Sequence, residues 1–127
     1  MIVYDPAVDP NPAEWLALDE VDRISLVEDY HKEAGIEVPN LLLHATVHVT
    51  VETQVAMGEE LPVRRTLHRL IREGLDRHDA IHAIGSILAE HVVKIVKETG
   101  KGSDDPNPRY FGAVERLTAR RWKRSAR

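Results

Sequence analysis

Apolar side chains recur at helical spacing from Pro12 to Gly35. Asn11 and Pro12 resemble an N-cap and the first residue of a helix, and Glu14 lies where a capping box places its carboxylate. Gly35 is a typical C-terminal stop. The pattern therefore predicts a helix over residues 12–34, whose apolar positions include Leu16, Ile24, Val27 and Tyr30.

The segment over residues 41–55 carries two patterns at once. Apolar residues alternate with more polar ones, which is typical of a strand: Leu41, Leu43, Ala45, Val47, Val49 and Val51. The same residues also form an apolar arc on a helix, and a regular strand of about 15 residues would be unusually long. Because Asn40 offers an N-cap, we predict a helix here.

Start and stop residues indicate three more helices. Pro62 opens a segment with apolar residues spaced by three and four, which ends at Gly74. Asp76 is an N-cap for the next helix, which extends to about Glu98. A loop over residues 101–106 then precedes a last helix, whose apolar residues are Tyr110, Phe111, Val114 and Leu117.

The predicted fold is therefore all-α, a single-domain helical bundle of about five helices with two central helices that carry histidines. The bundle spans residues 11–122, after an N-terminal extension over residues 1–10 and before a basic tail over residues 123–127. A chain of 127 residues is the usual size of one domain and can bury a single core.

Two pairs of histidines lie on the central helices. Each pair is four residues apart, and the pairs are His44 with His48 and His78 with His82. Residues four apart share one face of a helix, and on a helical wheel both pairs fall inside the apolar arc. Glu52 lies at the edge of the first arc and Glu90 just outside the second. Since an unpartnered buried polar group costs roughly 1–3 kcal/mol, four such imidazoles need compensation.

Two interpretations supply that compensation. A shared divalent transition metal is our leading hypothesis, with Glu52 or Glu90 as an additional ligand or as an acceptor of an imidazole hydrogen bond; the pattern does not separate Zn, Fe, Mn and Ni. The alternative is a buried hydrogen-bonded network in which the two carboxylates accept from the histidines. His31 is a candidate fifth ligand, although a solvated histidine beside Glu28 and Asp29 is the favoured interpretation.

The number of ligands separates a structural site from a catalytic one. Four imidazoles around a tetrahedral ion leave no position for water, whereas three leave one that Glu52 or Glu90 could activate for hydrolysis. Neither pair reads HExxH, because Ala45 and Asp79 follow the leading histidines. The chain has no cysteine, which excludes thiolate ligands and disulfides. Whether the protein is an enzyme therefore stays open at this stage.

The net charge of −4 conceals opposite charges in the two halves of the chain. Residues 1–60 carry 13 acidic and 2 basic side chains, and residues 61–127 carry 8 acidic and 15 basic ones. The halves should attract each other within one chain or between two copies. This asymmetry supports a second hypothesis, a non-enzymatic homo-oligomeric interaction module, such as a homodimer, with a buried histidine network.

Other partners and compartments are less favoured. The basic residues around Trp122 make nucleic-acid binding a third hypothesis, which the acidity of the first 60 residues disfavours. The N-terminus lacks a basic segment followed by an apolar one, and no apolar run approaches 18 residues. We therefore expect a cytoplasmic protein that does not bind membranes, and no small-molecule substrate can be named.

The runs Leu43–Gln54 (LHATVHVTVETQ) and His78–Glu90 (HDAIHAIGSILAE) resemble the central pattern of an uncharacterised bacterial family, domain of unknown function 1841. The resemblance covers about residues 38–98, and the chain departs from the pattern at Asp79, where the family tends to have Glu. The resemblance implies no reaction. It implies a small all-helical protein in which these residues sit together: His44, His48, Glu52, Gln54, His78, His82 and Glu90.

Overall fold

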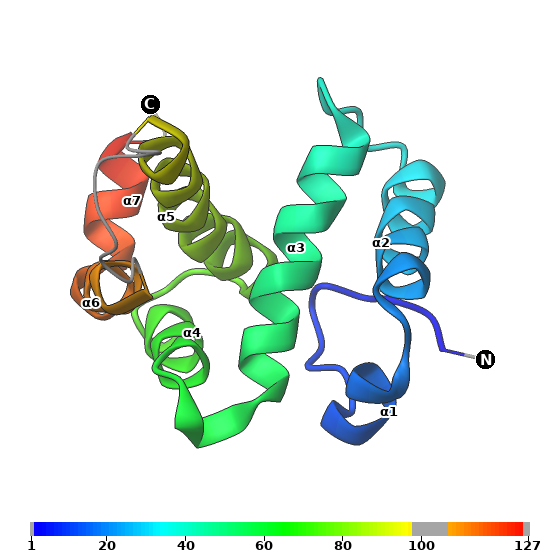
Figure 1. Ribbon diagram of the computed structural model, residues 1–127, viewed down its shortest axis with the longest axis horizontal. Helices are drawn as coiled ribbons and strands as arrows, with labels where there is room; N and C mark the ends of the chain where they lie inside the picture. Colours follow the sequence, from blue (N-terminus) through cyan, green and yellow to red (C-terminus); the bar gives the residue numbers. More distant parts are fainter. Residues whose placement is uncertain (1, 98–106, 126–127) are drawn as a thin grey trace.

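The computed structural model describes residues 2–97 and 107–125, and within these ranges it contains helices and no strand, which confirms the predicted all-α fold. Figure 1 shows α3 (Leu41–Ala56) in the middle, with α2 (Glu20–Ala34) on one side and α4 (Val63–Arg72) and α5 (Arg77–Lys97) on the other. Three shorter helices lie at the outer edges: α1 (Pro12–Ala17), α6 (Asn107–Arg116) and α7 (Ala119–Ser125). A 3-10 turn, η1 (Gly58–Glu60), joins α3 to α4.

The predicted first helix is in fact two helices, α1 and α2, so the prediction of one continuous helix was wrong. Leu18 and Asp19 adopt extended backbone conformations, with ψ of 149° and 153°. The Arg23 guanidinium donates to the carbonyls of Trp15 and Leu16, at 3.0 Å in each case. Because the last carbonyls of a helix lack partners inside it, this arginine stabilises the early end of α1.

The predicted N-caps are present. Side-chain oxygens of three residues accept from the backbone N–H three positions later: Asn11 from Glu14 at 3.1 Å, Asn40 from Leu43 at 3.0 Å and Asp76 from Asp79 at 2.7 Å. Residues 41–56 are therefore a helix, and the strand alternative is excluded. Gly35 ends α2 in the left-handed conformation, with φ of 70°.

The predicted last helix corresponds to α6, which ends at Arg116, so Leu117 lies in the break before α7. Arg69 of α4 donates to the carbonyl of Leu117 at 2.6 Å, and the Glu73 carboxylate accepts from the backbone N–H of Ala119 at 2.8 Å. Side chains at the end of α4 thus satisfy the backbone groups at this break, which a sequence pattern alone does not show. The loop predicted over residues 101–106 lies outside the described residues.

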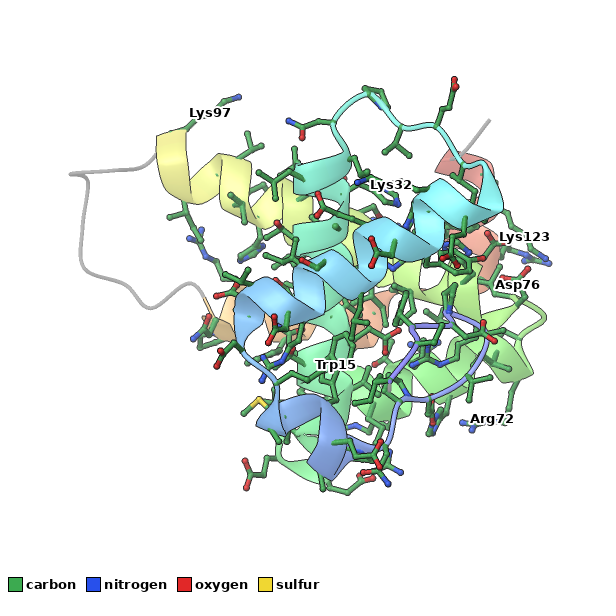
Figure 2. All side chains as sticks on the ribbon, turned by 90° about the vertical axis from the view of Figure 1, so that its right-hand side faces the viewer. Trp15, Lys32, Arg72, Asp76, Lys97 and Lys123 are labelled. Atoms are coloured by element: carbon green, nitrogen blue, oxygen red, sulfur yellow. The ribbon has the colours of Figure 1, made fainter. Side chains whose placement is uncertain are left out.

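Buried apolar side chains form two clusters that share α3. The larger cluster lies among α3 to α7 and includes Leu67, Ile81 and Val114. The smaller cluster joins the N-terminal segment, α1 and α2 to α3 through Tyr4 and Trp15. Figure 2 shows α2 crossing in front of α3, with Trp15 below the crossing. Helix α3 therefore has core packing on both sides, and polar side chains on it are enclosed by neighbouring helices.

Helices α3 and α5 approach each other closely at Gly85. A Cβ atom built on this buried glycine would lie 2.8 Å from Cγ1 of Val47, closer than packed carbon atoms tolerate. Gly85 lies one turn after His82, and Val47 directly precedes His48. The absence of a side chain at Gly85 thus allows the two histidine-bearing helices to come within reach of each other.

This contact predicts strong energetic coupling between the two positions. We expect Gly85→Ala to lower the free energy of unfolding by about 1–2 kcal/mol more in the wild-type chain than in a Val47→Ala background, because shortening Val47 removes the clash. Urea unfolding of the two single variants and the double variant measures this coupling. The cycle cancels the gain in helix propensity from Gly to Ala, and additivity within about 0.5 kcal/mol would contradict the contact.

Candidate metal centre

Five histidines from three helices meet between α2, α3 and α5. They are His31 on α2, His44 and His48 on α3, and His78 and His82 on α5. Their ring centroids are 4.3 to 6.1 Å apart. The four histidines predicted from sequence thus lie together, and His31 joins them. Since His31 is 0% exposed, the prediction of a solvated histidine at this helix end was wrong.

The proton on His31 is fixed by the helix that carries it. Its Nδ1 atom lies 2.8 Å from the backbone carbonyl oxygen of Val27. A carbonyl oxygen only accepts, so Nδ1 carries the proton and donates. In a neutral imidazole the other nitrogen then has a free lone pair, and the Nε2 lone pair of His31 is available to the cluster.

The proton on His48 is fixed by a longer chain of hydrogen bonds. The Tyr4 hydroxyl donates to Oε2 of Glu52 at 2.6 Å and also lies 3.1 Å from Nδ1 of His48. A phenol has one proton, so at the second contact its oxygen accepts and Nδ1 of His48 donates. Burial, reinforced by the charge of Glu52, raises the pKa of Tyr4 well above its usual value and keeps the phenol protonated. The Nε2 atom of His48 is left with its lone pair.

Arg77 holds the other end of this chain. Its guanidinium binds both carboxylate oxygens of Glu52, at 2.8 Å and 2.6 Å, and it also binds Asp9 at 2.7 Å and the Pro6 carbonyl at 2.9 Å. Burial alone would raise the pKa of Asp9, but the bond to Arg77 outweighs it and lowers that pKa. These ion pairs join the acidic and basic halves of the same chain, as their opposite charges predict.

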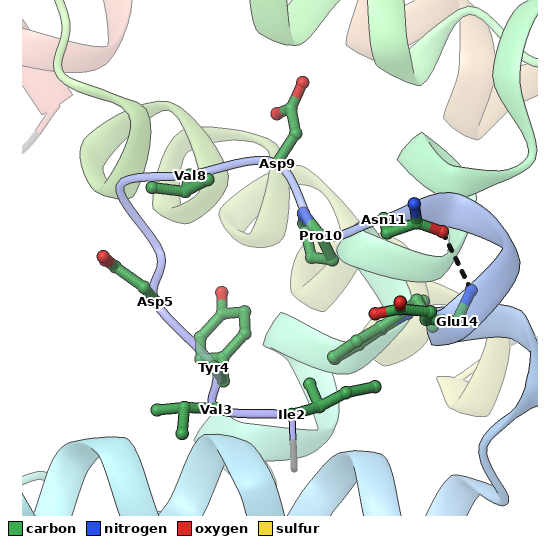
Figure 3. A pocket seen from close by; sticks show the side chains of 10 residues that line it. Ile2, Val3, Tyr4, Asp5, Val8, Asp9, Pro10, Asn11 and Glu14 are labelled. Atoms are coloured by element: carbon green, nitrogen blue, oxygen red, sulfur yellow. Dashed lines mark hydrogen bonds between the residues drawn. The ribbon is translucent and has the colours of Figure 1, made fainter.

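The N-terminal segment supplies three of the groups in this chain. Figure 3 shows residues 2–11 as a wide loop, with the Tyr4 side chain pointing into it and Asn11 bonded to Glu14 at the start of α1. Tyr4 is 2% exposed, and the loop borders a cavity of about 600 Å³. The segment predicted as an N-terminal extension is therefore linked to the histidine cluster, because Tyr4 contacts His48.

Three imidazole nitrogens are buried without a hydrogen-bond partner. No group of the described residues forms a hydrogen bond with Nε2 of His31, His44 or His78. Elsewhere in the cluster, Nε2 of His48 lies 3.0 Å from Nε2 of His82. Buried polar groups in proteins are almost always satisfied by protein, water or an ion. The described protein groups therefore leave these three nitrogens to be satisfied by water or by an ion.

The cluster favours neutral imidazoles. Burial, together with the repulsion of neighbouring histidines, lowers the pKa of His48 to about 2 and that of His82 to about 4. The same two causes lower the pKa values of His44 and His78. Neutral imidazole is the form that binds metal ions, so the protein environment holds these side chains ready for coordination at neutral pH.

The nitrogens group into two sets of three. One set is His44, His48 and His82, the other is His31, His48 and His78, and within each set the ligand atoms lie within 4.8 Å of one another. A tetrahedral zinc site with Zn–N distances of 2.0–2.1 Å places its nitrogens about 3.4 Å apart. The 3.0 Å contact between Nε2 of His48 and Nε2 of His82 is close to that value.

The first set opens onto a groove and the second does not. His44, His48 and His82 line a groove of about 750 Å³ between α3 and α5, whose wall includes Leu43 and Val92. Three protein ligands beside an accessible position is the arrangement of metal sites that bind a further ligand.

The two candidate carboxylates have different positions. Glu52 is 1% exposed and reaches the cluster only through Tyr4, because Arg77 and Tyr4 occupy its oxygens. Glu90 is exposed and lines a separate cavity beside His91 and Lys94, so the structure does not bring it to the cluster. Gln54, which the family resemblance places with the histidines, instead accepts from the Tyr110 hydroxyl at 2.7 Å.

Three residues of this centre were missed by the sequence pattern. Tyr4, Asp9 and Arg77 belong to no helical periodicity of apolar residues. One indication was present for Arg77, the first residue of α5, because a positive charge at a helix N-terminus is unfavourable unless a carboxylate compensates it. Tyr4 follows Ile2 and Val3 and precedes Asp5 and Pro6 in a segment without a periodic pattern, so no comparable indication exists.

One protein-family model matches most of the chain. The family model described as Domain of unknown function (DUF1841) matches residues 8–116. The chain belongs to this family. The match confirms the resemblance and extends it to residues 8–116, which include all five histidines of the cluster, whereas Tyr4 precedes the matched residues.

The remaining comparisons add no relative. No curated protein and no solved structure matched the chain. Within the described residues, no helix combines the length and the apolar character needed to cross a bilayer.

The lowered pKa values predict a specific pH dependence for the metal-free protein. The unfolded chain binds a proton on each histidine below pH 6.5, whereas the folded cluster resists protonation until the pH approaches about 4 for His82 and about 2 for His48. The free energy of unfolding should therefore be highest above pH 6.5 and fall as the pH decreases from 6.5 toward 5, with about two or more protons taken up on unfolding.

Urea unfolding at several pH values between 5 and 7.5 measures this slope. A His48→Gln/His82→Gln variant is the control, since it should show a shallower slope over the same range. A wild-type slope close to zero between pH 5 and 6.5 would contradict the buried, neutral cluster.

Proposed function

We propose that the protein binds one divalent transition-metal ion through His44, His48 and His82, with His31 and His78 behind them in the same cluster. The observations that carry the proposal are that the ligand atoms of these three histidines lie within 4.8 Å of one another and that the same three residues line a groove. One of them, His44, also has a buried Nε2 atom without a partner, and imidazole nitrogens suit Zn, Fe, Ni and related ions.

The surrounding hydrogen bonds support the same conclusion. Metal-binding histidines usually donate their second N–H to a carbonyl or to a group linked to a carboxylate, which fixes the ring and its tautomer. His31 donates to the Val27 carbonyl and His48 to the Tyr4 oxygen, which in turn is bonded to Glu52. These bonds fix the orientation of His48, a proposed ligand, and of His31 behind it. The Nε2 atom of His31 has no partner, and that of His48 lies 3.0 Å from Nε2 of His82.

The cluster supports one ion rather than two. His48 belongs to both sets of three nitrogens, and its Nδ1 atom is bonded to Tyr4. Its Nε2 atom can coordinate one ion, so the two sets are alternative positions. Access from the groove favours the set His44, His48 and His82.

The proposal extends to binding of a further ligand but names no reaction. A metal ion with three imidazole ligands supplies Lewis acidity and an exchangeable position. Hydrolysis with Glu52 as general base has little support, since Arg77 and Tyr4 occupy both of its oxygens. A homodimer and a cytoplasmic location stay predictions from sequence.

Metal binding can be tested on protein purified without an affinity tag. We expect about one equivalent of Zn²⁺ or Co²⁺ per chain and a rise of about 10 °C in the thermal midpoint when the free ion is near 100 times its Kd. His48→Ala should abolish binding, and His44→Ala and His82→Ala should weaken it more than about 100-fold. Metal analysis and the visible absorption of bound Co²⁺ are the measurements.

The control is His68→Gln, because His68 lies outside the cluster, 3.4 Å from Asp9. Less than about 0.2 equivalents of any transition metal, with a thermal midpoint unchanged by chelators, would overturn the proposal and leave the hydrogen-bonded network as the explanation. If His31→Ala and His78→Ala abolish binding while His44→Ala and His82→Ala do not, the ion is bound by His31, His48 and His78 instead.

Tyr4 provides a second test, aimed at the orientation of His48. Tyr4→Phe removes the hydroxyl that accepts from Nδ1 of His48, so we expect the affinity for Zn²⁺ to fall about 10- to 100-fold. Tyr30→Phe is the matched control, since its ring contacts His31 and His78 edge-on but, within the described residues, no hydrogen bond joins its hydroxyl to the cluster. Equal zinc affinities in the two variants would exclude this role for Tyr4.

A further inference from the structure

The groove above the histidines has an unusual lining for this protein. Charged residues make up 30% of the chain, yet no Asp, Glu, Lys or Arg lines the groove among the residues that the structure describes. Apolar residues on its walls are exposed at the surface, including Leu43 at 60% and Val92 at 50%. Such a wall has little affinity for a charged or strongly hydrated ligand.

The polar residues in the groove are already engaged. The hydroxyls of Thr46, Thr50 and Ser86 donate to carbonyl oxygens of their own helices, at 2.7, 2.9 and 2.7 Å. The side-chain oxygen of Asn40 accepts from the backbone of Leu43 as the N-cap of α3. The imidazoles of His44, His48 and His82 are therefore the side chains of the groove that can coordinate a metal ion.

These observations divide the groove into two chemically different parts. One part is formed by the imidazoles of His44, His48 and His82, and the rest of the lining is apolar apart from the hydroxyl and amide groups that are already engaged. A volume of about 750 Å³ lies within the range of small-molecule sites, which bury most of the surface of a bound ligand. A ligand that fits both parts has one metal-binding oxygen group and an uncharged apolar body.

We propose that the groove binds an amphiphilic carboxylate, with its carboxylate on the metal ion at His44, His48 and His82 and its hydrocarbon chain between Leu43 of α3 and Val92 of α5. This inference rests on the proposed metal site. It commits to a small molecule because the groove has the volume of a small-molecule site and combines apolar walls with the proposed metal ligands.

A chain-length series tests the inference on the zinc-loaded full chain. Titration calorimetry with acetate, butanoate, hexanoate and octanoate should show affinity rising about fourfold per methylene from butanoate to octanoate, since each buried methylene removes apolar surface from water. Octanoate should bind the metal-free protein at least tenfold more weakly. 1-Octanol, which has the same chain without the carboxylate, should bind more weakly than octanoate to the zinc form.

Two matched double variants locate the chain. Leu43→Asn/Val92→Asn should weaken octanoate at least tenfold while leaving the affinities for acetate and zinc unchanged. Leu42→Asn/Val21→Asn is the control, because Leu42 is also 60% exposed and adjoins Leu43, but neither control residue lines the groove. This control should bind octanoate as the wild type does.

Several results would overturn the inference while leaving the metal site intact. They are an affinity independent of chain length, equal binding with and without zinc, and equal effects of the two double variants. Light scattering provides one more such result. If the wild type is a dimer and the Leu43→Asn/Val92→Asn variant is a monomer, the groove is an interface between copies instead. Failure of the protein to bind zinc is detected by metal analysis before any carboxylate is added, and overturns the proposed function itself.

Discussion

Arg77 and Glu52 form an ion pair inside the protein, with side chains 6% and 0% exposed, and the histidine centre depends on it. The pair joins α5 to α3, and through Asp9 and the Pro6 carbonyl it also holds the N-terminal segment. Removing one partner of a buried pair typically costs 3–5 kcal/mol, because the other charge is left in a medium of low dielectric constant. The same pair holds Glu52 in place as the acceptor for Tyr4, and Tyr4 in turn fixes the orientation of His48.

The histidine cluster and the groove are two consequences of how α3 and α5 cross. Close approach at Gly85 brings their imidazoles together, and the burial that follows keeps those imidazoles neutral. Apolar side chains of the same two helices, such as Leu43 and Val92, line the groove beside the histidines. A ligand in the groove would thus contact both the apolar side chains and the metal-binding nitrogens.

The sequence predicted the repetitive parts of this structure well and the isolated contacts poorly. Helical periodicity and N-caps such as Asn40 and Asp76 are local, so the helix class and most helix starts follow from neighbouring residues. The break after α1 depends on Arg23, whose side chain reaches back to carbonyls of the preceding helix. The burial of His31 depends on α2 crossing α3, and the role of Tyr4 depends on a segment with no periodicity at all.

The sequence by itself determined that four histidines would face the core of a helical bundle, because spacing along a helix fixes which side chains share its apolar face. It also determined that any metal there would be held without thiolates, since the chain has no cysteine. Tertiary structure alone decided that His31 joins them, that Glu52 is held by Arg77 and Tyr4, and that Glu90 faces another cavity. The reason is that a carboxylate near the edge of an apolar arc, such as Glu52 or Glu90, can turn toward the core or toward solvent. It turns inward where a buried cation from a distant part of the chain compensates its charge, as Arg77 does for Glu52.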